Sequence, residues 1–171
     1  MCAIALIAAA AREKVDTSLA ARRIWRIMKI DFWQLSHDPV EKVTALIAQR
    51  VLDRGERLLV VSAEAEQRAV ISKGLWQAGP HTFLANGEAN DAGAPRQPIL
   101  LSDTMEARNG ATHAILADGT YREAAEFARV FLLFNEATLQ HARQTWKALS
   151  DREGLERAFF RQDAGKWVKV A

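Results

Sequence analysis

The sequence predicts an α/β protein: a single domain of three layers with a mostly parallel central sheet, Rossmann-like but without a nucleotide-binding loop. Continuous apolar runs such as RLLVVSA (57–63) and ARVFLLF (128–134) are typical of strands buried on both faces. Segments with apolar residues at helical spacing separate these runs. The chain has 171 residues, of which 49% are hydrophobic, so one domain with a sizeable core is expected.

The first predicted strand is KIDFWQL (29–35), which alternates and is rich in β-forming residues. Asp38 is the predicted N-cap of the helix that follows, with Pro39 at its first position and Glu41 at its third. This helix is expected to close at Gly55. The next elements are expected to be a strand at 57–63, a helix at 64–78 ended by Gly79 and Pro80, and a short extended piece at 81–85.

The second half begins with a Gly-, Asn- and Pro-rich stretch at 86–98 that lacks any period and is predicted to be a mobile loop. A helix that contains HARQTWKALS is expected to begin at Asn135 or Glu136. The remaining expectations are strands at 98–103, 112–118 and 128–134, a turn of helix at 122–127, and a closing hairpin of 155–162 with 165–170, turned at 163–165.

Residues 1–27 differ from the rest of the chain. The apolar run at 2–11 is too short to span a bilayer, and no basic segment precedes it as in a secretory signal. Met28 stands immediately before the first clean strand. We therefore expect an N-terminal extension at 1–27, either a disordered arm or the product of a wrongly set start, and a folded domain at 28–171.

Composition limits the function. The net charge is only +2 and part of it lies in the extension, so the body lacks the basic stripe of a typical nucleic-acid binder, and no sequence-specific DNA contact is expected. The single cysteine, Cys2, excludes an internal disulfide framework and fits the cytoplasm. No membrane association is predicted.

Motifs for cofactor chemistry are missing. The sequence contains no G-x-x-x-x-G-K-[ST] loop, no G-x-G-x-x-G after the first strand and no G-x-S-x-G elbow. The four histidines lack metal-ligand spacing with one another. We therefore predict no cofactor, no metal and no catalytic residue.

An enzyme nevertheless remains an alternative. His37, Asp103 and Asp118 each follow a predicted strand, and ligands bind outside the carboxyl ends of strands in open α/β sheets. Each of these residues also has an ordinary role in turns and helix caps. Position alone thus supports a small Rossmann-like enzyme that acts at the sheet edge.

Three ordered segments carry a resemblance to a known family. They are GLWQAGPHTFLANG (74–87), PILLSD (98–103), and FNEATLQHARQTWKAL (134–149) followed by FFRQDAGKW (159–167). Together they resemble the chi subunit of bacterial DNA polymerase III holoenzyme. The resemblance covers residues 28–171.

The resemblance implies a non-catalytic accessory subunit of the clamp loader, acting in DNA replication. The implied partners are the acidic C-terminal tail of single-stranded DNA-binding protein, which ends in an apolar residue, and the psi subunit where one exists. A DNA repair helicase is a further candidate. The sequence does not reveal the psi-facing surface; the outer side of the sheet away from the Trp146 helix is a candidate, although no motif marks it.

The resemblance also implies tail-binding residues. Arg143 would bind the terminal carboxylate, and apolar side chains would enclose the terminal side chain. The residues carried over are Trp76, Phe83, Leu132, Arg143, Trp146 and Lys147.

Two alternatives to a tail pocket stay open. Trp146 falls on a helical stripe with Leu139 and Leu149, so from the spacing alone it is explained as core. Leu139 occupies a position where some relatives carry lysine, which leaves the second cationic contact to Lys147. A scaffold that has lost tail binding would fit the same sequence.

Overall fold

The computed structural model describes residues 27–79 and 82–171. The predicted extension at 1–27 falls almost entirely outside these residues, as do Pro80 and the first residue of the piece predicted at 81–85. The described strands are β1 (Met28–Gln34), β2 (Leu58–Val61), β3 (Asn86–Glu88), β4 (Ile99–Ser102), β5 (His113–Leu116), β6 (Arg129–Phe134), β7 (Leu155–Asp163) and β8 (Lys166–Lys169). The helices are α2 (Val40–Leu52), α3 (Ala65–Trp76), the 3₁₀ turn Ala94–Arg96, and α4 (Leu139–Ala148).

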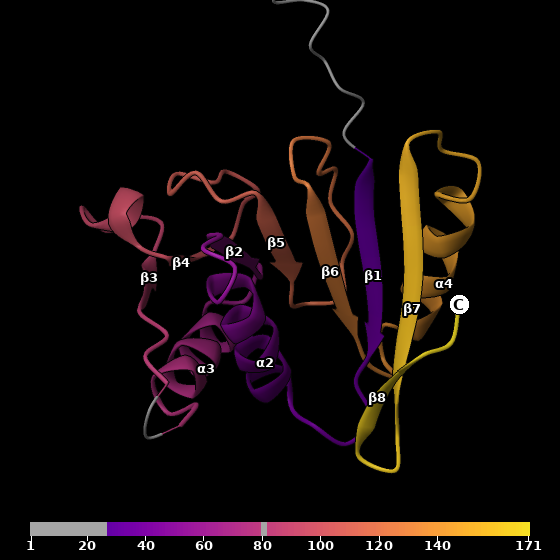
Figure 1. The fold of residues 1–171 in the computed structure, drawn as a ribbon, viewed down its shortest axis with the longest axis horizontal. Coiled ribbons are helices and arrows are strands. Elements are labelled where there is room, and N and C mark those ends of the chain that lie inside the picture. The colour runs from indigo at the N-terminus through magenta and orange to yellow at the C-terminus, as the bar shows by residue number, and fades with distance from the viewer. Residues whose placement is uncertain (1–26, 80–81) are drawn as a thin grey trace, which may run out of the picture.

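One eight-stranded sheet runs through the molecule in the order β3-β4-β2-β5-β6-β1-β7-β8 (Figure 1). All neighbouring strands are parallel except β7 and β8, which form the predicted antiparallel hairpin. Ala164 and Gly165 both have positive φ, at 48° and 76°, as a tight hairpin turn requires. The predicted α/β class with a mostly parallel sheet is confirmed.

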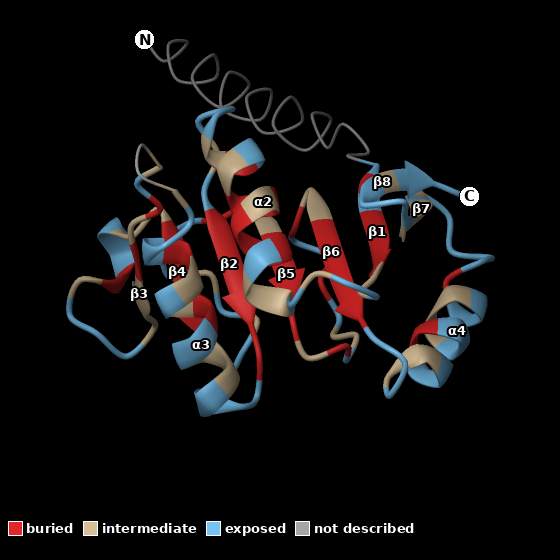
Figure 2. Ribbon diagram, turned by 90° about the horizontal axis from the view of Figure 1, so that it is seen from below, coloured by how far each residue is buried: buried red, intermediate tan, exposed pale blue. Residues whose placement is uncertain are grey.

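Two apolar clusters lie on opposite faces of the sheet. Successive side chains of a strand point to opposite faces, so Phe32 packs into the cluster that includes α4, whereas Trp33 packs into the cluster that includes α2 and α3. Figure 2 shows the buried central strands between these layers. The arrangement is the predicted three-layer domain.

Helix α2 begins without the predicted Asp38 cap. Its N-cap is Pro39, and no side chain bonds to the first turn. The Asp38 carboxylate accepts a hydrogen bond from Lys42 Nζ at 2.6 Å and another from the Gln162 amide. The carboxylate is thereby held by a basic side chain of the helix and by β7, which is why it does not cap the helix.

Helix α4 begins at Leu139, later than predicted. Asn135 and Thr138 bond reciprocally: each side-chain oxygen accepts a hydrogen bond from the other residue's backbone N–H, at 3.1 and 3.2 Å. This closes a turn before the helix. Thr138 also packs so closely on Gly119 (φ 74°) that a Cβ there would lie 2.5 Å from its hydroxyl.

Two further sequence predictions need correction. The stretch 86–98 is not wholly loop, because it contributes β3 and the 3₁₀ turn. Residues 122–127 form no helix. Their backbone instead follows the turn after β5, where Arg122 donates two hydrogen bonds to the Asp118 carboxylate. No helix in the described part of the chain is long and apolar enough to cross a membrane.

Candidate peptide-binding site on helix α4

Trp146 lies half-buried on the inner side of helix α4. Its ring meets Phe32 of β1 edge to face, with centroids 5.0 Å apart. The guanidinium of Arg157, from β7, lies 4.4 Å from the Trp146 ring centroid and also donates a hydrogen bond to the Trp146 carbonyl. These contacts hold the indole in place as one wall of an open space, and part of the indole stays accessible to solvent.

That open space is a cavity of about 370 Å³ between α4 and the sheet. Strands β1, β6 and β7 contribute its floor near their carboxyl ends, and α4 forms its side. The lining is mostly aromatic and aliphatic, with one amide and one guanidinium. It consists of Phe32, Gln34, Phe134, Leu139, Ala142, Arg143, Trp146, Phe159 and Ala171.

Arg143 is the charged group of this cavity. It is exposed and lies one helical turn before Trp146. Its guanidinium makes no hydrogen bond or ion pair within residues 27–79 and 82–171. A planar donor without a protein partner beside an apolar slot suits a ligand that carries a carboxylate next to an apolar group.

Lys147 and Leu139 take different parts in the site. Leu139 lines the cavity, where it adds apolar wall. Lys147 lies outside it, in a shallower groove of about 420 Å³ shared with Gln140, Arg143, Gln144 and Trp146. Arg143 and Lys147 are four residues apart on the helix, so they present two cations along its outer side.

The cavity, the helix that carries Arg143 and the sheet beneath it fall largely within a region that matches a known family. The family of the DNA polymerase III chi subunit, HolC, matches residues 27–156, more than half of the chain. The chain belongs to the DNA polymerase III chi subunit family. No curated protein matches it.

Membership confirms the resemblance read from the sequence. Members of this family are accessory subunits of DNA polymerase III, which places the chain in DNA replication. The matched region contains all of α4 but ends at the second residue of β7, so Phe159 lies beyond it.

The structure does not gather the predicted tail-binding residues of this chi family member at one place. Arg143 and Trp146 share the cavity, and Lys147 lies beside it. Leu132 is fully buried in β6 beneath the α4 layer and does not line the cavity. Trp76 and Phe83 lie near the end of α3, and Figures 1 and 2 place α3 and α4 at opposite ends of the sheet.

Trp76 and Phe83 form a separate surface feature. Their ring centroids lie 5.4 Å apart, edge to face. Trp76 is 49% exposed and Phe83 is 77% exposed. Two large aromatic side chains that contact each other in solvent are unusual, and they mark a surface that a partner can cover. We call this feature the Trp76–Phe83 patch.

Sequence reasoning missed most of the cavity's floor. Phe32, Gln34, Phe134 and Phe159 line it but were not predicted. Phe32 pairs in register with Leu132 and Phe159, on strands about 100 and 127 positions away in sequence. The one available signal was that Phe32 and Gln34 share a strand face near the carboxyl end of β1.

The alternative enzyme site is also not assembled. His37, Asp103 and Asp118 follow β1, β4 and β5, and in the sheet β6 separates β1 from β5 while β2 separates β5 from β4. Desolvation of the Asp118 carboxyl is outweighed by hydrogen bonds from Arg122 and from the Ala63 and Thr120 backbone, which hold its pKa below the ordinary value. Asp118 is therefore an ionised structural carboxylate.

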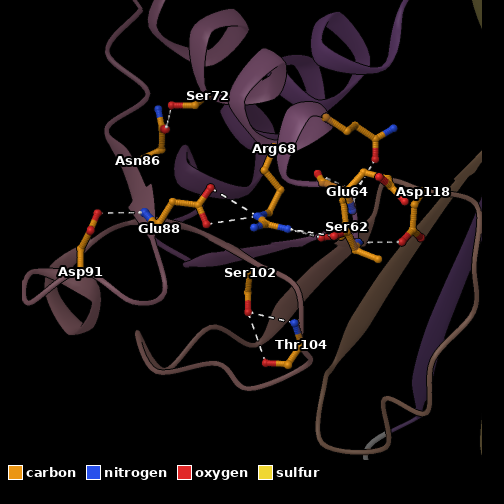
Figure 3. A network of polar contacts seen from close by, with 12 residues as sticks. Ser62, Glu64, Arg68, Ser72, Asn86, Glu88, Asp91, Ser102, Thr104 and Asp118 are labelled. Atoms are coloured by element: carbon orange, nitrogen blue, oxygen red, sulfur yellow. Dashed lines mark hydrogen bonds and ion pairs between the residues drawn. The ribbon is translucent and has the colours of Figure 1, made fainter.

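Paired polar side chains link α3 to β3 and to the end of β2 (Figure 3). Arg68 of α3 bonds to Glu88 at 3.1 Å and donates to the Ser62 carbonyl at 2.7 Å. Ser72 donates to Asn86 at 2.7 Å. These bonds tie α3 to β3 and the end of β2. Within the described ranges, no group of three or more His, Cys, Asp or Glu side chains is placed to hold a metal ion.

Proposed function

We propose that this chi family member binds the acidic C-terminal tail of single-stranded DNA-binding protein and links it to the clamp loader of DNA polymerase III. One observation carries the proposal: an aromatic cavity of about 370 Å³ with Arg143 at its rim, whose guanidinium has no partner among the described residues. The terminal apolar side chain would enter between Trp146, Phe134 and Phe159. The terminal carboxylate would accept hydrogen bonds from Arg143.

The expected affinity follows from these contacts. Burial of one phenyl side chain contributes roughly 1.5–3 kcal/mol, and a hydrogen bond to a charged group adds about 1.5–3 kcal/mol. Together they fall short of the ~8 kcal/mol of a micromolar complex. Attraction between Lys147 and acidic residues upstream in the tail supplies more, and salt screens it. The contact is thus weak and salt-sensitive, and it strengthens when one oligomer presents several tails.

A fluorescence-anisotropy titration tests the tail proposal. A labelled acidic peptide ending in Ile-Pro-Phe is titrated with the wild-type protein and with Arg143→Ala, and an amidated peptide is titrated with the wild type. We expect binding of the free-acid peptide, and loss of about tenfold or more on removal of either charge. The proposal is contradicted if neither Arg143→Ala nor amidation of the peptide weakens binding, or if no binding is seen at low salt.

We further propose that the Trp76–Phe83 patch faces the psi subunit. The patch lies away from α4, so a tail and a second partner would not compete for space. Exposed aromatic side chains are the kind of residue that dominates protein interfaces once covered. A repair helicase would be an alternative occupant of the same patch.

Co-expression with the psi subunit of the same organism tests this second contact. The variant carries Trp76→Ser and Phe83→Ser, and Arg143→Ala is its matched control. We expect psi to co-purify with the wild type and the control but not with the double variant. Retention of psi by the double variant would show that the psi interface is not the Trp76–Phe83 patch. If psi is retained by the wild type while tail peptides never bind, the chain is a scaffold without tail binding.

The proposed role is non-catalytic and cytoplasmic. Asp118 is occupied by Arg122 and backbone N–H groups, and His37 and Asp103 lie after strands that are not neighbours of β5 in the sheet. A thermal-shift panel of nucleotides and divalent cations tests this part. A stabilisation lost in Asp118→Asn would support the enzyme alternative instead.

A further inference from the structure

A second cavity lies on the other face of the sheet, beneath the last turns of α2. Its volume is about 110 Å³, several times the ~30 Å³ that one water occupies in the liquid. Strands β1, β5 and β6 form its floor. It is lined by Trp33, Ile47, Arg50, Val51, Arg54, His113, Arg129 and Phe131.

The polar groups of this cavity are mainly donors. Arg50 and Arg54 are exposed, lie one turn apart and make no side-chain hydrogen bond or ion pair in the described part of the chain. Arg129 pairs with the buried Asp31 carboxylate at 2.5 Å, which leaves two of the three arginine charges uncompensated. Guanidinium groups donate hydrogen bonds and accept none.

Trp33 supplies an independent indication of a ligand. The residue is 4% exposed, and its indole Nε1 is buried without an acceptor among the described residues. A buried donor left without a partner costs about 1–3 kcal/mol. Since Trp33 lines the same cavity as the three arginines, an oxyanion there would supply the acceptor that Nε1 lacks.

Aromatic side chains continue from the cavity across the uncovered face of β7 and β8. Trp33 stacks on Phe160 with centroids 4.9 Å apart, and its centroid lies 4.5 Å from that of Trp167. Phe160 and Trp167 are partly exposed. Lys169 pairs in register with Phe160, so it extends the basic charge along this face.

We propose that this face binds single-stranded nucleic acid through its backbone, with one phosphate in the Arg50–Arg54–Arg129 cavity and a base against Trp167. A cationic slot beside a stackable ring is the arrangement with which proteins hold single strands without reading sequence. The contact needs only this local group of basic side chains, not a basic stripe over the whole body, and it reads no base sequence. It lies on the opposite face from the α4 cavity and does not depend on tail binding.

Anisotropy of a labelled oligothymidine at low salt tests the proposal, with Arg50→Glu/Arg54→Glu as the variant. Lys73→Glu/Arg96→Glu is the control, because it makes the same change of charge at exposed positions outside the cavity. We expect the variant to weaken binding by about tenfold or more and to lower the salt slope by about 0.7, since the cavity holds one phosphate and each single-strand phosphate contact contributes ~0.7. The affinity of the control variant for the oligothymidine should fall much less.

The indole N–H resonance of Trp33 gives a second readout, and inorganic phosphate is the comparison ligand. We expect the oligonucleotide to shift this resonance in wild type and control, but not in the variant. Equal weakening of both double variants would overturn the proposal, because a diffuse charge effect would explain it. A Trp33 shift with phosphate alone, without oligonucleotide binding, would also overturn it and leave a site for free phosphate.

Discussion

The α4 cavity and the Trp76–Phe83 patch both present tryptophan on the surface, yet they are built differently. Trp146 contacts Phe32 on one side and Arg157 on another, and it lines a cavity beside Arg143, which has no partner in the described part of the chain. Trp76 touches Phe83 in solvent and lines neither the α4 cavity nor the groove beside it. The first arrangement suits a small chain end with a carboxylate, and the second suits a broad apolar partner surface.

The largest expected difference between the two regions is in stability. Trp146→Ala removes a half-buried ring that packs on Phe32 and Arg157, so we expect a loss of about 3 kcal/mol in the free energy of unfolding, with loss of tail binding. Trp76→Ala should cost less than about 1 kcal/mol, because the residue is 49% exposed and, among the described residues, packs against neither apolar cluster of the core. Urea unfolding of both variants checks this. Equal losses would mean that the two rings are packed alike.

A substitution near the start of α3 should lower stability but leave tail binding at α4 unchanged. Asp118→Asn weakens the bonds from Arg122 and the Ala63 N–H, and we expect a loss of about 1.5–3 kcal/mol at pH 7. The folded-state pKa of Asp118 is lowered, so its stabilisation is complete above the ordinary value of 3.8 and is lost as the pH falls through the folded value.

Urea unfolding at pH 7 and near pH 3 measures this effect, with the tail-peptide affinity as the control. The gap between wild type and Asp118→Asn should narrow in acid, while the affinity at pH 7 stays the same. A gap independent of pH would show that the carboxylate charge is not what stabilises the turn.

A smaller effect separates the cavity from its outer groove. Lys147→Ala should weaken binding of the tail peptide by about 1.4- to fivefold at low salt, as expected for an exposed charge contact worth about 0.2–1 kcal/mol. At ~1 M salt, where the screening length is about 3 Å, the variant and the wild type should bind alike. Anisotropy at both salt concentrations measures this. A deficit that persists at high salt would place Lys147 in direct contact with the ligand.

The smallest effect is expected at the most exposed ring. Phe83→Ala should change the free energy of unfolding by no more than about 0.5 kcal/mol, because the side chain is 77% exposed. Thermal unfolding measures this, and tail-peptide affinity should also be unchanged. A large destabilisation would show that Phe83 supports the fold and is not kept for a partner.

The sequence was sufficient for the apolar strands, but not for β3, a short Asn-Gly-Glu segment that was predicted to be loop. Leu58–Val61, Ile99–Ser102 and Arg129–Phe134 are short apolar runs, and strands buried on both faces leave that mark whatever their neighbours are. Helix starts were harder. Asp38 and Asn135 both have the chemistry of a cap, but long-range or turn contacts engage their side chains elsewhere.

The candidate site was only partly predictable. Arg143 and Trp146 are one turn apart on a helix, so local spacing was enough to pair them. Phe134 and Phe159 meet with centroids 6.2 Å apart only because strand register brings distant segments together. Trp76 and Trp146 look alike in sequence, each near a helix end with basic neighbours, and only the layer that carries each helix separates them.

The central claim is that the tail binds at α4 and not at the Trp76–Phe83 patch. The most direct measurement is a nitrogen–proton spectrum of the indole N–H groups during titration with the acidic peptide ending in Ile-Pro-Phe. We predict that the Trp146 resonance moves with peptide concentration while those of Trp76 and Trp167 stay in place. Movement of Trp76 with a stationary Trp146 would contradict the account.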